Sequence, residues 1–409
     1  MNVLISLGNI TPSDDANTNI AKLIAAQIKE GNNVCMLGTA FQQASEKEVV
    51  DGVTYYRILR IEKEKHKKLW QEWSSLGNKS QKIRFILKHP LYFAGLCFRH
   101  MRAKFTDVSE KAYIKKLKEI EKAERIDRVI VITSPFYIVT AVQKAIKNAE
   151  VVWYQLDPNQ SNITTIYKGK TDLLEKEKSV YEFVKYAVIP RLVYEENMQN
   201  ELSVYKEKML PAEFPNVRKL SVVSVDDDVC FDETKINLVF VGVFYEDIRN
   251  PVSLFEIISK TKNEDIVLNI VGGGCEEIVE EWAAKFPNKI IRHGYRSLEA
   301  ALNAMQRADI LVNVDNTAKN MLPSKVNDYI STGKPIVNLH PFEDNKTIEY
   351  FGKYQLHHNL YMGNICEKSI KAFEDFCIEN KGKNVDIEEI IENYKESTAE
   401  YVSALLLKE

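Results

Sequence analysis

Short apolar runs and segments of helical periodicity alternate along most of the chain. The run NVLISLG (Asn2–Gly8) ends in a glycine, and the segment TNIAKLIAAQIKEG that follows has apolar residues at helical spacing and stops at Gly31. The runs NNVCMLG, GVTYYRIL, RVIVITS and VVWYQLDP continue the pattern. Strands joined through helices by short connections form parallel sheets with right-handed crossovers, so this half of the chain is predicted to be one doubly wound domain.

A second series of the same kind begins with INLVFVG (Ile236–Gly242) and continues through IVLNIVGGG, KIIRHGY and DILVNV to KPIVNL. The linker segment before it, LPAEFPNVRKLSVVSVDDDVCFDETK (Leu210–Lys235), contains two prolines and an acidic run, as linkers between domains do. The 409 residues also exceed what a single core comfortably holds. We therefore predict an α/β fold of two Rossmann-like, doubly wound domains, 1–205 and 206–380, with a ligand cleft between them. We expect a C-terminal helix, 381–409, to return to the N-terminal domain.

The composition excludes several classes of protein. Hydrophobic residues make up 45% and charged residues 28% of the chain, and the formal net charge is −3, so overall charge indicates neither a nucleic-acid-binding nor a membrane protein. The six cysteines form no C-x-x-C pair, which is typical of reduced thiols rather than a zinc site. The sequence has no apolar run of about 18 residues and no signal-peptide pattern, so we expect a cytoplasmic protein.

The pattern of strands and helices is interrupted by an insertion at 57–106, which is strongly basic and has aromatic residues interleaved with the charges. A basic amphipathic insertion is typical of peripheral contact with a membrane surface, here the inner face. It is equally consistent with a solvated helical face whose aromatic residues pack on the domain. Binding of nucleic acid is a third interpretation that nothing else in the chain supports, so no nucleic-acid partner is expected.

The segment PSKVNDYISTGKPIV carries the first candidate site. Ser324 and Lys325 lie in the first turn of a predicted helix, and Asp328 lies one turn later on the same side as Ser324. A helix N-terminus beside a hydroxyl and an ammonium group attracts phosphate, and a carboxylate one turn later can accept both hydroxyls of a ribose. The alternative is ordinary helix punctuation, with proline at the start and glycine at the end.

Two further loops follow strands of the same predicted sheet. Gly242 lets a ligand approach the backbone closely, and Arg249 either makes a charge-assisted fork on a diphosphate or caps its own loop as a surface arginine. The run IVGGGCEE, with Gly272 and Gly273, resembles a dinucleotide fingerprint only weakly, because Glu277 occupies the third glycine position.

Other candidates lie in neighbouring loops of the two predicted domains. Between KIIRHGY and its helix, the backbone near Tyr295 and Arg296 is free to read a base edge. In the first domain we expect the loop that begins at Gly8 to face the cleft together with Asp157 of QLDPN. A carboxylate there binds or deprotonates an acceptor hydroxyl, although Asp157 is also explained as the turn residue of an Asp-Pro pair.

In order and content these motifs resemble the GT-B glycosyltransferases, particularly the nucleotide-sugar-dependent family 4 type. The most specific segment, PSKVNDYISTGKPIV, is similar to the P-x-K-x-x-E-Y-x-x-x-G-K-P pattern of bacterial surface-polysaccharide transferases. Where that family carries two glutamates separated by seven residues, this chain has Asn320 and Asp328. Val243 stands where the family often has a basic residue, which leaves Arg249 and Lys325 to neutralise the leaving diphosphate.

The resemblance implies a glycosyltransferase that moves a sugar from a UDP- or GDP-linked donor to a hydroxyl of a glycan or lipid-linked glycan, with retention at the anomeric carbon. It implies no cofactor and no metal ion. Asn320 and Asn316 would face the sugar, and Asp157, Asn320, Arg249 and Lys325 are the predicted catalytic residues. A nucleotide-sugar 2-epimerase shares the architecture and is one alternative. A catalytically silent partner subunit is the other, and it is motivated by Asn320 and Val243.

Overall fold

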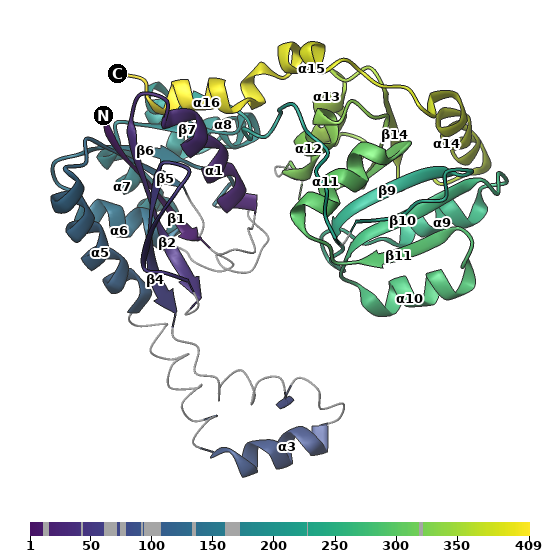
Figure 1. The fold of residues 1–409 in the computed structure, drawn as a ribbon, viewed down its shortest axis with the longest axis horizontal. Coiled ribbons are helices and arrows are strands. Elements are labelled where there is room, and N and C mark those ends of the chain that lie inside the picture. The colour runs from purple at the N-terminus through teal and green to yellow at the C-terminus, as the bar shows by residue number, and fades with distance from the viewer. Residues whose placement is uncertain are drawn as a thin grey trace. The chain divides into compact units, whose positions relative to one another are not determined.

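The computed structural model describes residues 1–10, 16–41, 44–60, 72–73, 79–90, 93, 108–132, 136–159, 172–226, 228–318 and 322–409. The chain divides into two compact units, each built around one sheet (Figure 1). The first unit comprises Met1–Leu156, Thr171–Ile189 and Val204–Leu210, and the second comprises Asp157–Lys170, Pro190–Ser203 and Pro211–Glu409. The predicted fold class, two Rossmann-like domains with parallel sheets, is confirmed.

The sheet of the first unit has eight strands in the order β3-β4-β2-β1-β5-β6-β7-β8. Their bounds are β1 (Asn2–Asn9), β2 (Asn33–Phe41), β3 (Lys47–Val50), β4 (Val53–Arg60), β5 (Arg128–Ile132), β6 (Glu150–Tyr154), β7 (Tyr186–Ile189) and β8 (Met209–Pro211). Strand β1 pairs in parallel with β2 on one side and with β5 on the other. The order of winding therefore reverses at β1, as in a doubly wound sheet.

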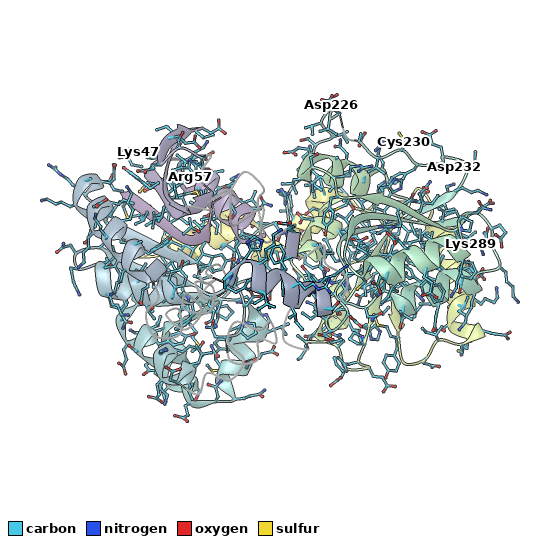
Figure 2. All side chains as sticks on the ribbon, turned by 90° about the horizontal axis from the view of Figure 1, so that it is seen from below. Lys47, Arg57, Asp226, Cys230, Asp232 and Lys289 are labelled. Carbon is cyan, nitrogen blue, oxygen red and sulfur yellow. The ribbon has the colours of Figure 1, made fainter. Side chains whose placement is uncertain are left out.

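The edge strand β3 is a departure from the predicted all-parallel pattern, because it pairs antiparallel to β4. Asp51 and Gly52 connect the two strands with φ angles of 50° and 80°, and an Asp-Gly pair with two positive φ angles is the preferred two-residue hairpin connection. Lys47 of β3 and Arg57 of β4 extend from this hairpin (Figure 2). Lys47 lies 3.3 Å from the Glu124 carboxylate, so the charged edge is tied to the rest of its unit.

The helices of the first unit lie between these strands in the sequence. They are α1 (Ala16–Ile28), α3 (Lys79–Lys88), α5 (Val108–Glu124), α6 (Tyr137–Ala145) and α7 (Leu173–Phe183), and the chain then continues through α8 (Arg191–Met198) and the 3-10 helix η1 (Glu201–Lys208). The core holds fully buried aromatic side chains, among them Tyr113, Trp153 and Tyr181. Their large buried area is a main source of the hydrophobic stabilisation of this unit.

The sheet of the second unit has six strands in the order β11-β10-β9-β12-β13-β14, and neighbouring strands pair in parallel. The strands are β9 (Ile236–Val243), β10 (Ile266–Gly273), β11 (Ile290–Gly294), β12 (Ile310–Val314), β13 (Ile336–His340) and β14 (His357–Tyr361). The helices are α9 (Val252–Lys260), α10 (Glu276–Lys285), α11 (Leu298–Arg307), α12 (Lys325–Ser331), α13 (Lys346–Phe351) and α14 (Glu367–Asn380). Strands β12 and β13 are buried along their whole length, which explains their continuous apolar sequences.

The C-terminal segment is not one continuous helix. It forms α15 (Ile387–Asn393), the short 3-10 helix η2 (Lys395–Ser397) and α16 (Ala399–Leu406). The side chain of Thr398 accepts a hydrogen bond from the Tyr401 amide at 3.3 Å and starts α16 as a new helix. The predicted return of this segment to the N-terminal domain stays a prediction. In the described part of the chain, no helix combines the length and the apolar character needed to cross a membrane.

Candidate functional site

The order of winding in the second unit reverses between β9 and β12, which pair with each other in parallel. In sheets of this kind, ligands bind outside the carboxyl ends of the strands at the point of reversal. Gly242 and Val243 end β9, and Asp315 and Asn316 follow β12 directly. This position at the switch point, together with Lys325 at the start of α12, defines the candidate site.

Lys325 extends from α12 over the end of β9. Its Nζ lies 3.9 Å from the centroid of the Phe240 ring and 3.5 Å from the Val241 carbonyl oxygen. The φ angle of Gly242 is +135°, which favours glycine, and a Cβ atom there would lie 3.9 Å from this Nζ, in ordinary contact. Burial lowers the pKa of Lys325 well below its usual value, the Arg249 guanidinium lowers it further, and Asp315 raises it.

Arg249 is brought to the same place by a tight loop, in which its backbone bridges antiparallel to Tyr245. Its Nη2 donates to Oδ1 of Asn316 at 2.8 Å, and its Nη1 donates to the Val243 carbonyl at 3.3 Å. The buried Nε has no hydrogen-bond partner in the part of the chain that the structure describes. A guanidinium that is held by two neutral acceptors keeps its positive charge available for an anion.

Asp315 is a component of the site that the sequence interpretation missed. Its side chain is 2% exposed, and Oδ1 accepts a hydrogen bond from the Asn316 amide at 2.8 Å while Oδ2 accepts one from the Thr347 hydroxyl. Burial raises the pKa of Asp315 to about 6. The two hydrogen bonds and the positive charges of Arg249 and Lys325 act in the other direction and lower this pKa. Its place directly after an apolar strand that ends at the switch point is the signal that would have found it.

Four residues predicted from three separate segments of the sequence therefore meet at one place. The group consists of Gly242, Arg249, Asn316 and Lys325. It contains two cationic side chains that influence each other, and the carboxylate of Asp315 is within electrostatic range of both. Such a cluster can bind an anion that has more than one negative charge, as a diphosphate does.

The start of α12 differs in detail from the prediction. The helix has seven residues, and Ser324 precedes it in a helical conformation without a side-chain capping bond. The Ser324 carbonyl accepts a hydrogen bond from Asn216 at 2.9 Å. Because α12 is short, its dipole adds little, and the argument for anion binding depends on the two cationic side chains.

Asp328 has a partner that lies far away in the sequence. Its Oδ1 accepts a hydrogen bond from Nη1 of Arg218 at 2.8 Å, and both side chains are partly buried. Burial raises the pKa of Asp328, whereas Arg218 and Asn216 lower it. The predicted ribose-binding carboxylate is thus already fixed by an ion pair with the linker segment.

The glycine-rich turn after β10 is explained by packing. A Cβ atom at Gly272, where φ is +136°, would lie 1.9 Å from the Gly242 carbonyl oxygen. A Cβ atom at Gly273 would lie 2.6 Å from the Tyr295 ring. The backbone contact requires glycine at 272 whether or not a nucleotide binds, whereas the exposed Tyr295 side chain can move away from a Cβ atom at 273. The roles of Gly272 and Gly273 in binding stay predictions. Tyr295 is 67% exposed, and Arg296 is exposed beside it.

The remaining predicted residues are not linked to this cluster by any described contact. Gly8 lies in β1, near its carboxyl end, and its carbonyl accepts a hydrogen bond from the Thr39 hydroxyl at 2.7 Å. Asp157 lies three residues beyond the end of β6, and burial raises its pKa to about 6. Asn320 lies outside the described residues. Among the residues that are described, no three His, Cys, Asp or Glu side chains are grouped so as to hold a metal ion.

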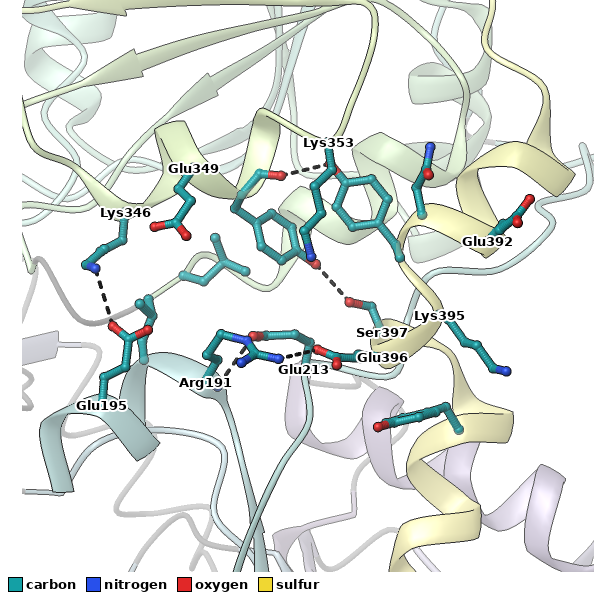
Figure 3. Close-up of a pocket in the computed structure, with 16 residues that line it drawn as sticks. Arg191, Glu195, Glu213, Lys346, Glu349, Lys353, Glu392, Lys395, Glu396 and Ser397 are labelled. Carbon is teal, nitrogen blue, oxygen red and sulfur yellow. Dashed lines mark hydrogen bonds and ion pairs between the residues drawn. The ribbon is translucent and has the colours of Figure 1, made fainter. Parts of the chain in front are cut away.

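A cavity of about 370 Å³ opens within the second unit (Figure 3). Charged side chains line it, and several are paired across it: Arg191 with Glu396 at 2.9 Å, and Lys346 with Glu195 at 3.3 Å. Glu213 is buried in its wall, and burial raises the pKa of this carboxyl to about 7. Pairing of this kind gives the cavity no net preference for an anion, in contrast to the cluster at Lys325.

Comparisons with known proteins identify the fold. No protein-family model matches the chain, and no curated protein matches it in sequence. Among solved structures it is similar to the lipopolysaccharide outer core galactosyltransferase WaaB (TM-score 0.56, 12% identity, covering 98% of both chains). It is also similar to Anabaena Alr3699/HepE in complex with UDP (TM-score 0.56, 10% identity, covering 99% of this chain and 95% of the other).

A third similar structure has a different activity. The UDP-GlcNAc 2-epimerase of Methanocaldococcus jannaschii has a TM-score of 0.54 and 12% identity, and the match covers 99% of both chains. All three likenesses extend over nearly the whole chain. They show the two-domain GT-B fold, and at these identities they show the fold alone.

Proposed function

We propose that the protein is a glycosyltransferase that takes a sugar from a nucleoside diphosphate sugar. The observation that carries the proposal is the pair of cationic side chains, Lys325 and Arg249, at the carboxyl ends of β9 and β12. A switch point with two cations fits a diphosphate better than it fits a neutral ligand. The likeness to a structure that contains UDP supports the same class of donor.

The proposed reaction transfers a glycosyl group. The bond from the anomeric carbon to the β-phosphate oxygen breaks, and its electron pair stays on the nucleoside diphosphate. A hydroxyl oxygen of a glycan or lipid-linked glycan forms the new bond to that carbon, with retention of configuration, and the hydroxyl proton leaves to a base. Lys325 and Arg249 stabilise the charge that develops on the leaving group, an interaction that is stronger in the transition state than in the bound donor.

The other residues have proposed roles that follow from the resemblance of the motifs. Asp328 binds the ribose of a UDP- or GDP-linked donor, with Arg218 fixing its orientation. Asn316 and Asn320 face the sugar, and Asp157 binds or deprotonates the acceptor hydroxyl.

The other proposed contacts are with the nucleotide and the acceptor. Ser324 and Gly242 border the diphosphate. The turn at Gly272 and Gly273 admits the nucleotide, and Tyr295 and Arg296 lie beside the base. Gly8 borders the acceptor. No metal ion or cofactor takes part in this scheme.

Two other functions have specific support. The likeness to the 2-epimerase favours an isomerase that acts on the donor alone. Asn320 and Val243, which stand where the resembled family has charged residues, favour a partner subunit without catalytic activity. Incubation with a nucleotide sugar and no acceptor distinguishes an epimerase from a glycosyltransferase, because an epimerase isomerises the sugar under these conditions. A silent subunit binds no nucleotide.

Calorimetric titration with UDP and with GDP tests the proposal. We expect one of them to bind and expect Lys325→Met to weaken this binding at least about tenfold, equivalent to about 1.4 kcal/mol. Lys334→Met is the matched control, because it removes another partly buried lysine whose pKa is lowered and which lies outside the cluster. A thermal-shift screen of nucleotide sugars then identifies the donor. Equal affinity in both variants, or no binding by the wild type, would remove the proposed site.

A further inference from the structure

The helix α3 (Lys79–Lys88) presents a row of apolar side chains to solvent. Ile83 is 58% exposed, Ile86 is 37% exposed and Leu87 is 73% exposed. These positions are related by three and four residues, so they form one stripe on the helix surface. Single exposed apolar residues are ordinary, but three in one stripe indicate a surface that is covered by a partner.

The opposite face of α3 packs against aromatic side chains. Phe85 is 7% exposed, and its ring centroid lies 4.6 Å from that of His89 and 6.1 Å from those of Trp73 and Phe93. Trp73 and Phe93 contact each other at 4.9 Å. These aromatic side chains fix one face of α3, and the stripe of Ile83, Ile86 and Leu87 is not needed for that packing.

The charges around the stripe have one sign. The ten residues of α3 include Lys79, Lys82, Arg84 and Lys88 and no acidic residue. The surrounding insertion, 57–106, contains 13 lysine and arginine residues against 3 glutamates in a chain whose formal net charge is −3. The positive charge is thus concentrated in the segment that carries the exposed apolar stripe.

We propose that α3 binds the surface of a membrane that contains anionic lipids. Ile83, Ile86 and Leu87 enter the boundary between headgroups and acyl chains, while the exposed side chains of Arg84 and Lys88 contact the lipid phosphates. A helix that combines an apolar stripe with flanking cations lies in the interface plane, and each cation near an anionic leaflet adds to the attraction. Ten residues of helix extend about 15 Å, which suits a helix that lies on a bilayer and does not cross it.

The stripe distinguishes this partner from nucleic acid. Phosphate contacts by lysine and arginine dominate binding to nucleic acid, and binding of that kind leaves aliphatic side chains in water. Aliphatic residues in a row between cations match the two layers of a lipid interface, which is apolar below and anionic above. The stripe and the cations are therefore predicted to act together.

Co-sedimentation of the full chain with vesicles tests the proposal without any nucleotide, so its outcome is independent of the proposed function. The wild type is expected to bind vesicles of phosphatidylglycerol mixed with phosphatidylcholine and not vesicles of phosphatidylcholine alone. The double variant Ile83→Ser/Leu87→Ser and the charge variant Arg84→Gln/Lys88→Gln are each expected to lower the partition coefficient at least about tenfold. Salt should weaken binding of the wild type.

The control is Val204→Ser/Ile378→Ser, which removes two apolar side chains that are 75% and 51% exposed elsewhere. It should partition like the wild type, and equal thermal midpoints show that all variants fold. The proposal is overturned when the wild type does not bind anionic vesicles, or when the α3 variants bind them as well as the control does. Binding to single-stranded RNA that depends on the lysines but not on Ile83 and Leu87, without vesicle binding, also overturns it.

Discussion

Arg218 donates a hydrogen bond from Nη1 to Oδ1 of Asp328 at 2.8 Å, across 110 residues of sequence. The same Nη1 contacts the Asn216 carbonyl at 2.7 Å, and the Arg218 amide donates to the Ser331 hydroxyl at 3.1 Å. The linker segment is therefore fastened to α12 at Asp328 and at Ser331, and the carboxylate predicted to bind ribose has a fixed orientation.

Arg218→Met is expected to lower the free energy of unfolding by about 1–3 kcal/mol, because it leaves the partly buried Asp328 carboxylate without its cation. A double-mutant cycle with Asp328→Asn, followed by urea denaturation, should give a coupling energy of about 1 kcal/mol. The exposed pair Arg292 and Glu280, 3.0 Å apart, is the control and should show almost no coupling. Additive effects of Arg218→Met and Asp328→Asn would contradict the structural role of the pair.

The fold could be predicted from sequence because each strand and helix is specified by the pattern of apolar residues within its own segment. Buried parallel strands such as β12 are continuous apolar runs, and the helices between them have apolar residues at helical spacing, so the alternation is visible in the sequence. The edge strand β3 was missed because it has only four residues and is mostly exposed, although the Asp51-Gly52 pair that turns the chain back was a readable signal. The break at Thr398 was missed because a capping hydroxyl within an amphipathic pattern resembles an ordinary surface residue.

The site could be predicted only in part because its contacts are not local. Gly242, Arg249 and Lys325 were found from glycine and charge at strand ends, where parallel sheets collect functional residues. Nothing in the linker sequence indicates that Arg218 pairs with Asp328, because pairing depends on the path of the chain through space. The packing reason for Gly272 was likewise hidden, since it depends on the carbonyl of Gly242.

Gly272→Ala is expected to destabilise the protein severely, by at least about 3 kcal/mol. The new Cβ atom would lie 1.9 Å from the Gly242 carbonyl oxygen, so one of the two strand ends must move. Gly294→Ala is the matched control: Gly294 also has a positive φ, +71°, but a Cβ atom there would meet nothing within 4 Å. The control should cost only the strain of that backbone conformation, about 1–2 kcal/mol. Equal losses in urea denaturation would show that φ alone, and not the close approach, requires glycine at 272.

Glu213 is expected to make the stability of the protein depend on pH. Burial raises its folded-state pKa to about 7, while an exposed glutamate in the unfolded chain titrates near about 4.3. The folded state therefore holds the proton more tightly, and stability is lost as pH rises from about 4.5 to 7. Glu213→Gln mimics the protonated form, so its free energy of unfolding should exceed that of the wild type progressively over this range, by about 3 kcal/mol at pH 8. Parallel stability curves for the two proteins would show that Glu213 titrates normally.

Lys325 is expected to take up a proton when a nucleoside diphosphate binds. Burial and Arg249 lower the pKa of Lys325 in the free protein. An anion beside the ammonium group raises this pKa again. At any pH between the pKa of the free protein and that of the complex, ligand binding is therefore accompanied by proton uptake. Titration calorimetry at several pH values below about 10.4, in buffers of different ionisation enthalpy, measures the uptake as the slope of the observed enthalpy against the ionisation enthalpy of the buffer. Lys325→Met should abolish the slope, whereas Lys334→Met should retain it. Nucleotide binding with no proton uptake by the wild type at any of these pH values would mean that the diphosphate does not contact Lys325, and would place the anion away from the carboxyl end of β9.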